Sequence, residues 1–522
     1  MSVAMPTAQP QRAGDQAGMR RGPSPRLTVV GIVVGLLMIY HANGDFLPGR
    51  DSVANAWLPV NLLGEGQLVF RPSRMPYLFD WRLAAGGQIV RFARWDEPLA
   101  GSTAAALYRD RRLVLSGPGY YLYPTQRVDA RSGERLYANT FGLGAGITAL
   151  PVIAPLRLVA RDLRAHPKLV WYAAKFAAAL AVALSAALLY LTMLRFVRPP
   201  IALVSSLAYG LGTCVWSTSS QALWQHGPSE LFLALGLYCL VSERANAVAA
   251  TFGGSALAMA VACRPTNAVV VAVVVAWLAI RDRRALLLLF LGALPIGLSL
   301  PAYNAYYQGS PVSSGQVEIA ETLARYKCGT PGVWQTPLWF GAAGLLASPG
   351  RGLFVYSPWL LLSLWGSVLA WRNRRWALLR PLPIAALVML AVHGKFYDWW
   401  GGWAFGYRPI VDSTVLLTPL AAIGLESLVE PQRRVARRLV CGALAVALAW
   451  SIGVQTLGAF AYDLAGWNAK LVDGVRQDID RPEYRHRLWS WRDNPIFYYA
   501  THFAESRQQR ALRVQAMCEQ PG

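Results

Sequence analysis

The chain has 522 residues, of which 54% are hydrophobic and only 15% are charged, and its formal net charge is +22. Because ordinary soluble domains carry roughly 25% charged residues, this composition excludes a typical soluble enzyme. In a soluble protein the net charge would suggest nucleic-acid binding, but here most arginines flank apolar blocks, which is a topogenic pattern. We therefore expect membrane lipids, and no nucleic acid, among the partners.

The N-terminus is a polar tail, 1–25, rich in glycine, proline and glutamine, which we expect to be disordered in the cytoplasm. A first apolar helix is predicted from about Leu27 to Ala42. It lacks a clear small-x-small cleavage site, so we interpret it as a retained helix and not as a secretory signal. The following stretch, 43–137, is too long and too charged to sit in lipid and predicts a large first outer loop.

Apolar segments resume near Phe141 and continue to about Phe460, and one crossing of the hydrocarbon layer takes about 20 residues. We therefore predict an all-α polytopic membrane domain over 26–461 with about 11 to 13 transmembrane helices. Two longer polar stretches, Tyr303–Trp339 and His393–Arg408, predict aqueous loops. The tail 462–522, which alternates charged and aromatic residues, predicts a small exposed C-terminal domain on the outer side.

Clusters of arginine separate many of the apolar blocks, and by the positive-inside rule these ends lie in the cytoplasm. They are Arg20, Arg21 and Arg26; Arg281, Arg283 and Arg284; Arg372, Arg374, Arg375 and Arg380; and Arg433, Arg434, Arg437 and Arg438. Two further basic groups conflict, because Arg161–Lys168 and the pair Arg195 and Arg198 flank a single span. Either one segment there is re-entrant or the rule fails once, so the topology over 140–200 stays open.

Metal-binding patterns are weak along the whole chain. The six cysteines are scattered without metal-ligand spacing, so we interpret them as small packing residues. The triplet Asp478-Ile479-Asp480 resembles a metal-binding Asp-x-Asp, but Arg476 and Arg481 flank it, and we interpret it as a solvated charge cluster. We predict no metal site and no certain cofactor; a divalent metal is possible but not indicated by the sequence.

Ionisable residues at membrane depth or at the mouth of a helical bundle are costly to hold, so each is a functional candidate. Asp45 and Asp51 follow the first helix, where a carboxylate could remove a proton from an acceptor. The alternative for this pair is a helix cap in a solvated turn.

Two candidates lie beside breaks in the apolar runs. His226, in Trp224-Gln225-His226-Gly227, could bind a phosphate or move a proton, or it could cap or pack against a helix. Arg264 precedes Pro265 and could pair with an anionic lipid head group or anchor a hairpin at the interface. The sequence does not choose between these alternatives.

Two more segments favour binding. Arg351 lies in a Gly and Pro bend before a long apolar helix, where backbone N–H groups and a guanidinium could converge on a phosphate. The segment His393–Pro409 is strongly aromatic, as interfaces are, but an aromatic belt does not require Lys395, Asp398 and Arg408 among four glycines. We predict a binding loop there.

Taken in order, these motifs resemble the GT-C class of membrane glycosyltransferases, and within it bacterial proteins similar to the dolichyl-phosphate-mannose protein mannosyltransferases, family 39. Each motif alone is weak, and their order and spacing carry the resemblance. They are Gly44-Asp45, Leu62-Leu63-Gly64-Glu65-Gly66, Trp224-Gln225-His226-Gly227, Arg264-Pro265-Thr266-Asn267, Tyr303-Asn304 with Gly309-Ser310-Pro311, Ser348-Pro349-Gly350-Arg351-Gly352-Leu353, and Trp399-Trp400-Gly401-Gly402-Trp403 with Gly406-Tyr407-Arg408.

The resemblance implies transfer of a sugar from a polyprenyl-phosphate donor to a glycan, lipid or protein acceptor on the non-cytoplasmic face of a bacterial cytoplasmic (inner) membrane. It also implies that an acidic residue of the first outer loop is the catalytic base. Asp51 and Asp45 match that placement, and Asp51 ranks first because its segment leads to Leu62-Leu63-Gly64. The adjacent Asp-Glu pair of the mannosyltransferases is missing after the first helix, since Asp96-Glu97 lies much deeper in the loop. The acceptor is therefore left open.

The predicted site follows from these motifs. Donor-phosphate ligands are expected among four cations, Arg351, Arg264, Lys395 and Arg408. Substrate-binding residues are expected to be His226, Trp224, Tyr303, Asn304, Asp398, Trp399, Trp400 and Tyr407.

Two other classes of protein compete with this prediction. A transporter or flippase of a lipid-linked saccharide or other anionic substrate would explain the basic, aromatic mouth equally well, but it predicts functional charges in mid-helix. The apolar runs are nearly free of Asp and Glu. A non-catalytic assembly subunit would leave the carboxylates after the first helix dispensable.

Overall fold

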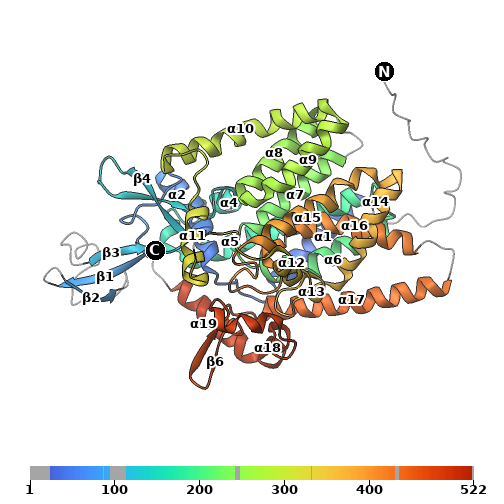
Figure 1. Ribbon diagram of the computed structural model, residues 1–522. Coiled ribbons are helices and arrows are strands. Elements are labelled where there is room, and N and C mark those ends of the chain that lie inside the picture. The colour runs from blue at the N-terminus through green and yellow to red at the C-terminus, as the bar shows by residue number, and fades with distance from the viewer. Residues whose placement is uncertain are drawn as a thin grey trace.

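The computed structural model describes residues 24–85, 88–93, 113–241, 247–330, 332–429 and 434–519. Residues 1–23 of the predicted tail and the Asp96-Glu97 pair lie outside the described residues. The described chain is a bundle of apolar helices, with strands and short helices gathered mainly at one end (Figure 1). The predicted all-α polytopic membrane fold is confirmed, and the chain is an integral membrane protein.

Long apolar helices form the bundle because a helix satisfies its own backbone polar groups in lipid. Helix α5 (Pro167–Met193) has 27 residues and is therefore about 40 Å long, enough to cross the hydrocarbon core. The other segments of sufficient length and hydropathy are α10 (Arg283–Gln308), Arg374–Lys395, which contains α15 (Pro381–Lys395), and Arg437–Phe460 of α17 (Arg434–Phe460). Seven shorter apolar helical segments of 10 to 17 residues accompany them in the described chain.

The remaining helices of the bundle are α1 (Pro25–His41), α4 (Gly144–Ile153), α6 (Pro199–Leu211), α7 (His226–Val241), α8 (Ala247–Cys263), α9 (Ala268–Arg281), α12 (Leu338–Ala347), α13 (Leu353–Tyr356), α14 (Leu362–Arg372) and α16 (Ser413–Val429). Local sequence sets several boundaries. Ser24 caps α1 by accepting a hydrogen bond from the backbone N–H of Leu27, and proline occupies the first turn of α1, α5, α6 and α15, where no intrahelical donor is needed.

Glycines let α8 and α10 cross in close contact. A Cβ atom built on Gly292 would lie 1.8 Å from the backbone oxygen of Thr251, and one on Gly254 would lie 1.9 Å from that of Leu289. Small residues at helix crossings are typical of membrane bundles, where backbone approach replaces the hydrophobic effect as the driving force. These two glycines therefore fix the distance between the two helices.

We expect Gly292→Ala to lower the stability of the protein by about 1 to 3 kcal/mol, because the added methyl forces the two backbones apart. This cost outweighs the gain of about 1 kcal/mol in helix propensity. The midpoint of thermal unfolding of the detergent-solubilised protein measures the effect. Gly297→Ala on the same helix is the control, since its Cβ meets nothing within 4 Å; equal midpoints for the two variants would contradict the prediction.

The first loop folds against one end of the bundle. It contains α2 (Val53–Glu65), an antiparallel sheet in the order β2 (Gln88–Ala93), β1 (Phe79–Ala85), β3 (Leu113–Pro118), and an antiparallel pair, β4 (Leu122–Val128) with β5 (Arg135–Asn139). Buried aromatic residues join it to α5, with Trp57 and Trp171 in edge-to-face contact at 6.0 Å between ring centroids. The loop is thereby held in a fixed position over the bundle.

The chain on either side of α4 contacts α2. Asn139 donates to Asn55 before α4 begins, and after α4 ends Arg157 donates to the backbone oxygen of Leu63. Both ends of α4 therefore contact the same helix of the first loop, as expected for the re-entrant alternative. Arg161–Lys168 thus lies on the first-loop side, where Glu65 pairs with Arg164 at 3.1 Å and offsets part of its charge.

Two of the other basic turns meet at the opposite end of the bundle. Arg198, after α5, forms an ion pair of 2.7 Å with Glu426 near the end of α16, and Arg375 donates to the backbone oxygen of Phe196. Helix α14 lies at this end, far from strands β1 to β3 (Figure 1). The first loop and the arginine-rich turns are therefore separated by the bundle.

The chain after α17 forms a small domain on the first-loop side. It contains the hairpin β6 (Ala469–Val472) and β7 (Val475–Asp478), then α18 (Pro495–Thr501) and α19 (Phe503–Cys518). Arg510 of α19 is fully buried and donates to the backbone oxygens of Ala459 and Tyr462 at the end of α17. The domain is thereby fastened to the last membrane helix.

Candidate functional site

A cavity of about 650 Å³ lies at the first-loop end of the bundle. Its walls come from six separate parts of the chain: the start of the first loop, the end of that loop near Tyr120 and Phe141, Trp224, the helix α11 (Gly315–Cys328), the aromatic loop 396–408 and the C-terminal domain. Its charged lining residues are Arg50, Asp51, Lys327, Asp398, Arg408, Arg476, Asp480 and Arg513. The cavity therefore combines carboxylates and guanidinium groups in one space large enough for a sugar.

Asp51 and Arg408 meet at the wall of this cavity. The Arg408 guanidinium forms an ion pair of 2.8 Å with one carboxylate oxygen of Asp51, and the hydroxyl of Tyr120 donates to the other. Arg408 also lies over the ring of Trp224, with 4.8 Å between the guanidinium carbon and the ring centroid. The side chain of Asp51 is 23% exposed, so a substrate in the cavity can contact its carboxylate. Arg408 and Tyr120 fix the orientation of that carboxylate from both sides.

Gly49 allows Trp224 to approach this pair. A Cβ atom at position 49 would lie 2.4 Å from the ring atoms of Trp224, so only glycine leaves room for the indole. The stacked Trp224 and Arg408 therefore lie directly beside the loop that carries Asp51.

Helix α11 covers the cavity with one face. Its lining residues, Gln316, Ile319, Ala320, Leu323 and Lys327, recur at the spacing of one helical stripe. Glu321 and Arg325 lie on the exposed outer face. The sequence predicted an aqueous loop for this part of the chain, and the structure places an amphipathic helix within it.

Lys327 fastens α11 to both neighbouring walls. Its ammonium group lies 2.7 Å from Asp398 of the aromatic loop and 3.0 Å from Asp480 of the C-terminal domain, and its side chain is only 9% exposed. Asp398 also accepts from the backbone N–H of Gly402, and Asp480 from the indole N–H of Trp400. The three charges therefore hold three walls of the cavity together.

The ionisation of these groups follows from their partners. Burial would lower the pKa of Lys327, but Asp398 and Asp480 raise it above its ordinary value. Burial raises the pKa of Asp480, against the opposing effect of Lys327. Burial, reinforced by Asp51, raises the pKa of Tyr120 well above its ordinary value, so its hydroxyl stays a neutral donor to Asp51.

Asp45, the second predicted base, lies outside the cavity lining. It forms an ion pair of 2.7 Å with the buried Arg510, and the side chain of Lys175 donates to its backbone oxygen. Burial raises the pKa of Asp45, while Arg510 and Lys175 oppose the rise. Its contacts fasten the C-terminal domain to the end of α1, and we propose Asp51 in preference to it as the base.

Of the four predicted phosphate ligands, only Arg408 lines the cavity. Arg351 is fully buried and donates to the backbone oxygens of Gly350, Trp400 and Gly402 and to the side chain of Asn468. Its donors hold the aromatic loop, so we propose that it positions the loop instead of binding phosphate. Lys395 is exposed at the end of α15.

Arg264 belongs to a buried polar cluster behind the cavity. It forms an ion pair of 2.8 Å with Asp412 and contacts His393, and Asp412 also accepts from Ser229 and Asn267. His226 lies 3.7 Å from the second oxygen of Asp412. Because Arg264 also donates to the backbone oxygen of Pro409, this cluster fixes the residue that follows Arg408.

Two buried acids of this region, Asp412 and Glu230, are absent from the residues predicted from the sequence. Glu230 is fully buried in α7 and accepts from Ser219. Both acids lie beside long apolar runs, and the cost of burying a carboxylate there was the signal that could have identified them.

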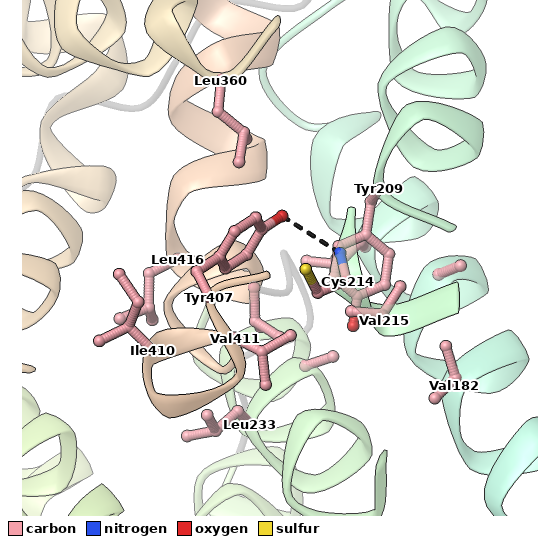
Figure 2. Close-up of a cluster of buried hydrophobic side chains, with 14 of the residues drawn as sticks. Val182, Tyr209, Cys214, Val215, Leu233, Leu360, Tyr407, Ile410, Val411 and Leu416 are labelled. Carbon is pink, nitrogen blue, oxygen red and sulfur yellow. Dashed lines mark hydrogen bonds between the residues drawn. The ribbon is translucent and has the colours of Figure 1, made fainter. Parts of the chain in front are cut away.

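The remaining predicted substrate ligands divide by position. Asp398 and Trp224 line the cavity, whereas Trp399, Trp400, Tyr303 and Asn304 do not. Tyr303 donates to the backbone oxygen of Leu68, and Asn304 to that of Pro311. Tyr407 is fully buried among apolar side chains, where its hydroxyl accepts from the backbone N–H of Cys214 (Figure 2).

The interpretation of Asp478-Ile479-Asp480 as a solvated charge cluster is wrong. Ile479 is buried, Asp480 lines the cavity, and Asp478 accepts from the indole N–H of Trp403. The error arose because the hairpin β6–β7 folds back onto the aromatic loop, which no local pattern indicates. Among the described residues, no group of three or more His, Cys, Asp or Glu side chains is arranged to hold a metal ion.

No protein-family model matches the chain, and no curated protein matches it. Among solved structures, ArnT from Cupriavidus metallidurans bound to undecaprenyl phosphate is 12% identical with a TM-score of 0.46, covering 95% of this chain and 77% of that one. The Archaeoglobus fulgidus oligosaccharyltransferase in the apo form is 10% identical with a TM-score of 0.48. That comparison covers 86% of this chain, which spans only 59% of the other. Both are GT-C glycosyltransferases, and neither likeness extends to the mannosyltransferase family or places a side chain of the site.

Proposed function

We propose that the protein is a membrane glycosyltransferase that moves a hexose or pentose from a polyprenyl-phosphate donor to an acceptor on the non-cytoplasmic face. The observation that carries the proposal is the carboxylate of Asp51, held by Arg408 and Tyr120 at the wall of the cavity. The position of this cavity, at the end of the bundle away from the arginine-rich turns, supports an outward-facing site by the positive-inside rule.

In the proposed reaction Asp51 takes the proton of the acceptor hydroxyl as its oxygen forms a bond with the anomeric carbon of the sugar. The bond between that carbon and the phosphate oxygen breaks, and the electron pair leaves with the lipid phosphate. Guanidinium groups favour the leaving phosphate because they meet its charge with directed hydrogen bonds. Arg408, which is paired with Asp51, and Arg50, which lines the same cavity, are the cations we assign to this step.

Membranes containing the wild-type protein are expected to transfer radiolabelled sugar from at least one member of a panel of polyprenyl-phosphate sugars. Membranes without the protein are the control. If no donor supports transfer and the protein instead moves a lipid-linked saccharide across the bilayer, the proposal is wrong and the carrier alternative replaces it. A third outcome is that neither activity is found, while cells that require the protein grow normally with an Asp51 variant. The assembly-subunit alternative then replaces the proposal.

A further inference from the structure

Three arginines of the cavity form no ion pair among the described residues, although Arg513 lies near enough to Asp463 to lower the pKa of that carboxyl, against the effect of its burial. Arg408 is paired with Asp51, and Lys327 is shared by two carboxylates. Among the described residues no carboxylate forms an ion pair with Arg50, Arg476 or Arg513, although all three line the same cavity. The walls therefore carry five cationic and three acidic side chains, an excess of two positive charges.

The proposed donor accounts for only part of this excess. A polyprenyl-phosphate sugar is a phosphodiester with a single negative charge. Arg50 directly precedes Asp51 in the chain, so it belongs to the part of the wall assigned to that phosphate. One net positive charge then remains, and the two guanidinium groups without an ion pair, Arg476 and Arg513, are the ones that can meet another anion.

Both remaining arginines come from the C-terminal domain. Arg476 lies on strand β7, and its guanidinium carbon stacks 5.1 Å from the centroid of the Trp403 ring. Arg513 lies on α19, the helix that Arg510 fastens to the end of α17. Two cations on separate elements of one fixed domain thus face one space, which is the arrangement that recognises a carboxylate or phosphate.

We propose that Arg476 and Arg513 form a second anion-binding subsite, and that the acceptor of the proposed transfer carries a carboxylate or phosphate that binds there. The proposal rests on the proposed function for the identity of the ligand as acceptor, but the anion-binding subsite itself can be measured without turnover. It makes the C-terminal domain the part of the protein that selects the acceptor.

The test is the binding of inorganic phosphate to the full-length protein in nanodiscs of zwitterionic lipid, with undecaprenyl phosphate present at saturation so that the donor subsite is filled. We expect the wild type to bind phosphate under these conditions and the double variant Arg476→Gln/Arg513→Gln to bind it at least roughly 30-fold more weakly. Arg492→Gln is the matched control, because Arg492 is an exposed arginine of the same domain and does not line the cavity.

The double variant should keep the affinity of the wild type for undecaprenyl phosphate. If it loses that affinity as well, the two arginines belong to the donor subsite and the proposal is wrong. Unchanged phosphate binding in the double variant, or equal loss in Arg492→Gln, would also overturn it. Since none of these measurements needs sugar transfer, they stand even if the proposed reaction fails its own test.

Nanodiscs that contain phosphatidylglycerol identify the source of the anion. If this lipid competes with inorganic phosphate in the wild type and equally in Arg492→Gln, the acceptor group is a lipid headgroup. If it does not compete while phosphate still binds, the acceptor is a soluble or glycan-borne anion. Either result retains the second subsite and narrows the class of acceptor.

Discussion

Replacing Asp51 with asparagine is expected to lower sugar transfer by about 10²- to 10⁴-fold, the usual contribution of a positioned general base. Asparagine keeps the size of the side chain, but its single amide oxygen can accept from only one of Tyr120 and Arg408, which now donate to different oxygens of the carboxylate. The loss should therefore appear in kcat while binding of undecaprenyl phosphate is retained. Single-turnover transfer at matched protein levels measures it.

Asp473→Asn serves as the control for this substitution. Asp473 is exposed in the turn between β6 and β7, and its positive φ of 50° is a conformation that asparagine adopts readily. Asp45→Asn gives a second comparison. We expect it to lower thermal stability more than the transfer rate, because it leaves the buried charge of Arg510 without its partner. Full transfer activity in Asp51→Asn would remove Asp51 from the reaction.

Replacing Lys327 with methionine is expected to destabilise the protein by about 3 to 5 kcal/mol, since it leaves Asp398 and Asp480 together without a counter-charge in a largely buried place. Helix α11 should then detach from the cavity and become sensitive to limited proteolysis. Thermal unfolding and the rate of cleavage within 315–328 measure the two effects. Arg325→Met, on the exposed face of the same helix, is the matched control.

A compensating variant separates charge from packing in this experiment. In Lys327→Met/Asp398→Asn/Asp480→Asn all three charges are removed, while asparagine can still accept from Gly402 and Trp400. Replacing a complete buried charge group by neutral residues is often close to neutral, so stability should largely return. A triple variant as unstable as Lys327→Met would show that the unpaired charges of Asp398 and Asp480 do not account for the loss of stability.

The stability difference between the wild type and Lys327→Met has a pH dependence that follows from the raised pKa of Lys327. A lysine whose pKa is higher in the folded than in the unfolded state contributes its full stability below the unfolded value, about 10.4. That contribution is lost only as the pH rises through the folded value. The stability difference between wild type and Lys327→Met should thus be constant from about pH 7 to pH 9.

Much of the architecture was predictable because membrane insertion is decided by local composition. An apolar run of sufficient length must span, a charged stretch of the length of 43–137 must not, and arginines mark the ends between spans. These are properties of contiguous segments, so the polytopic bundle and the arginine-rich turns could be predicted without the fold. Asp51 and Arg408 could each be predicted as a site residue for the same reason, since each lies in a polar segment beside an apolar one.

Only the tertiary structure decided which of the predicted site residues are in contact. Asp51 and Arg408 are 357 residues apart in the chain, and Lys327 is 71 residues from Asp398. The sequence likewise predicted Arg351 as a phosphate ligand, whereas in the fold its guanidinium donates to backbone oxygens of the aromatic loop. A local pattern shows that a charge is costly where it lies, but its partner is selected by how distant segments pack, and packing is a property of the whole chain.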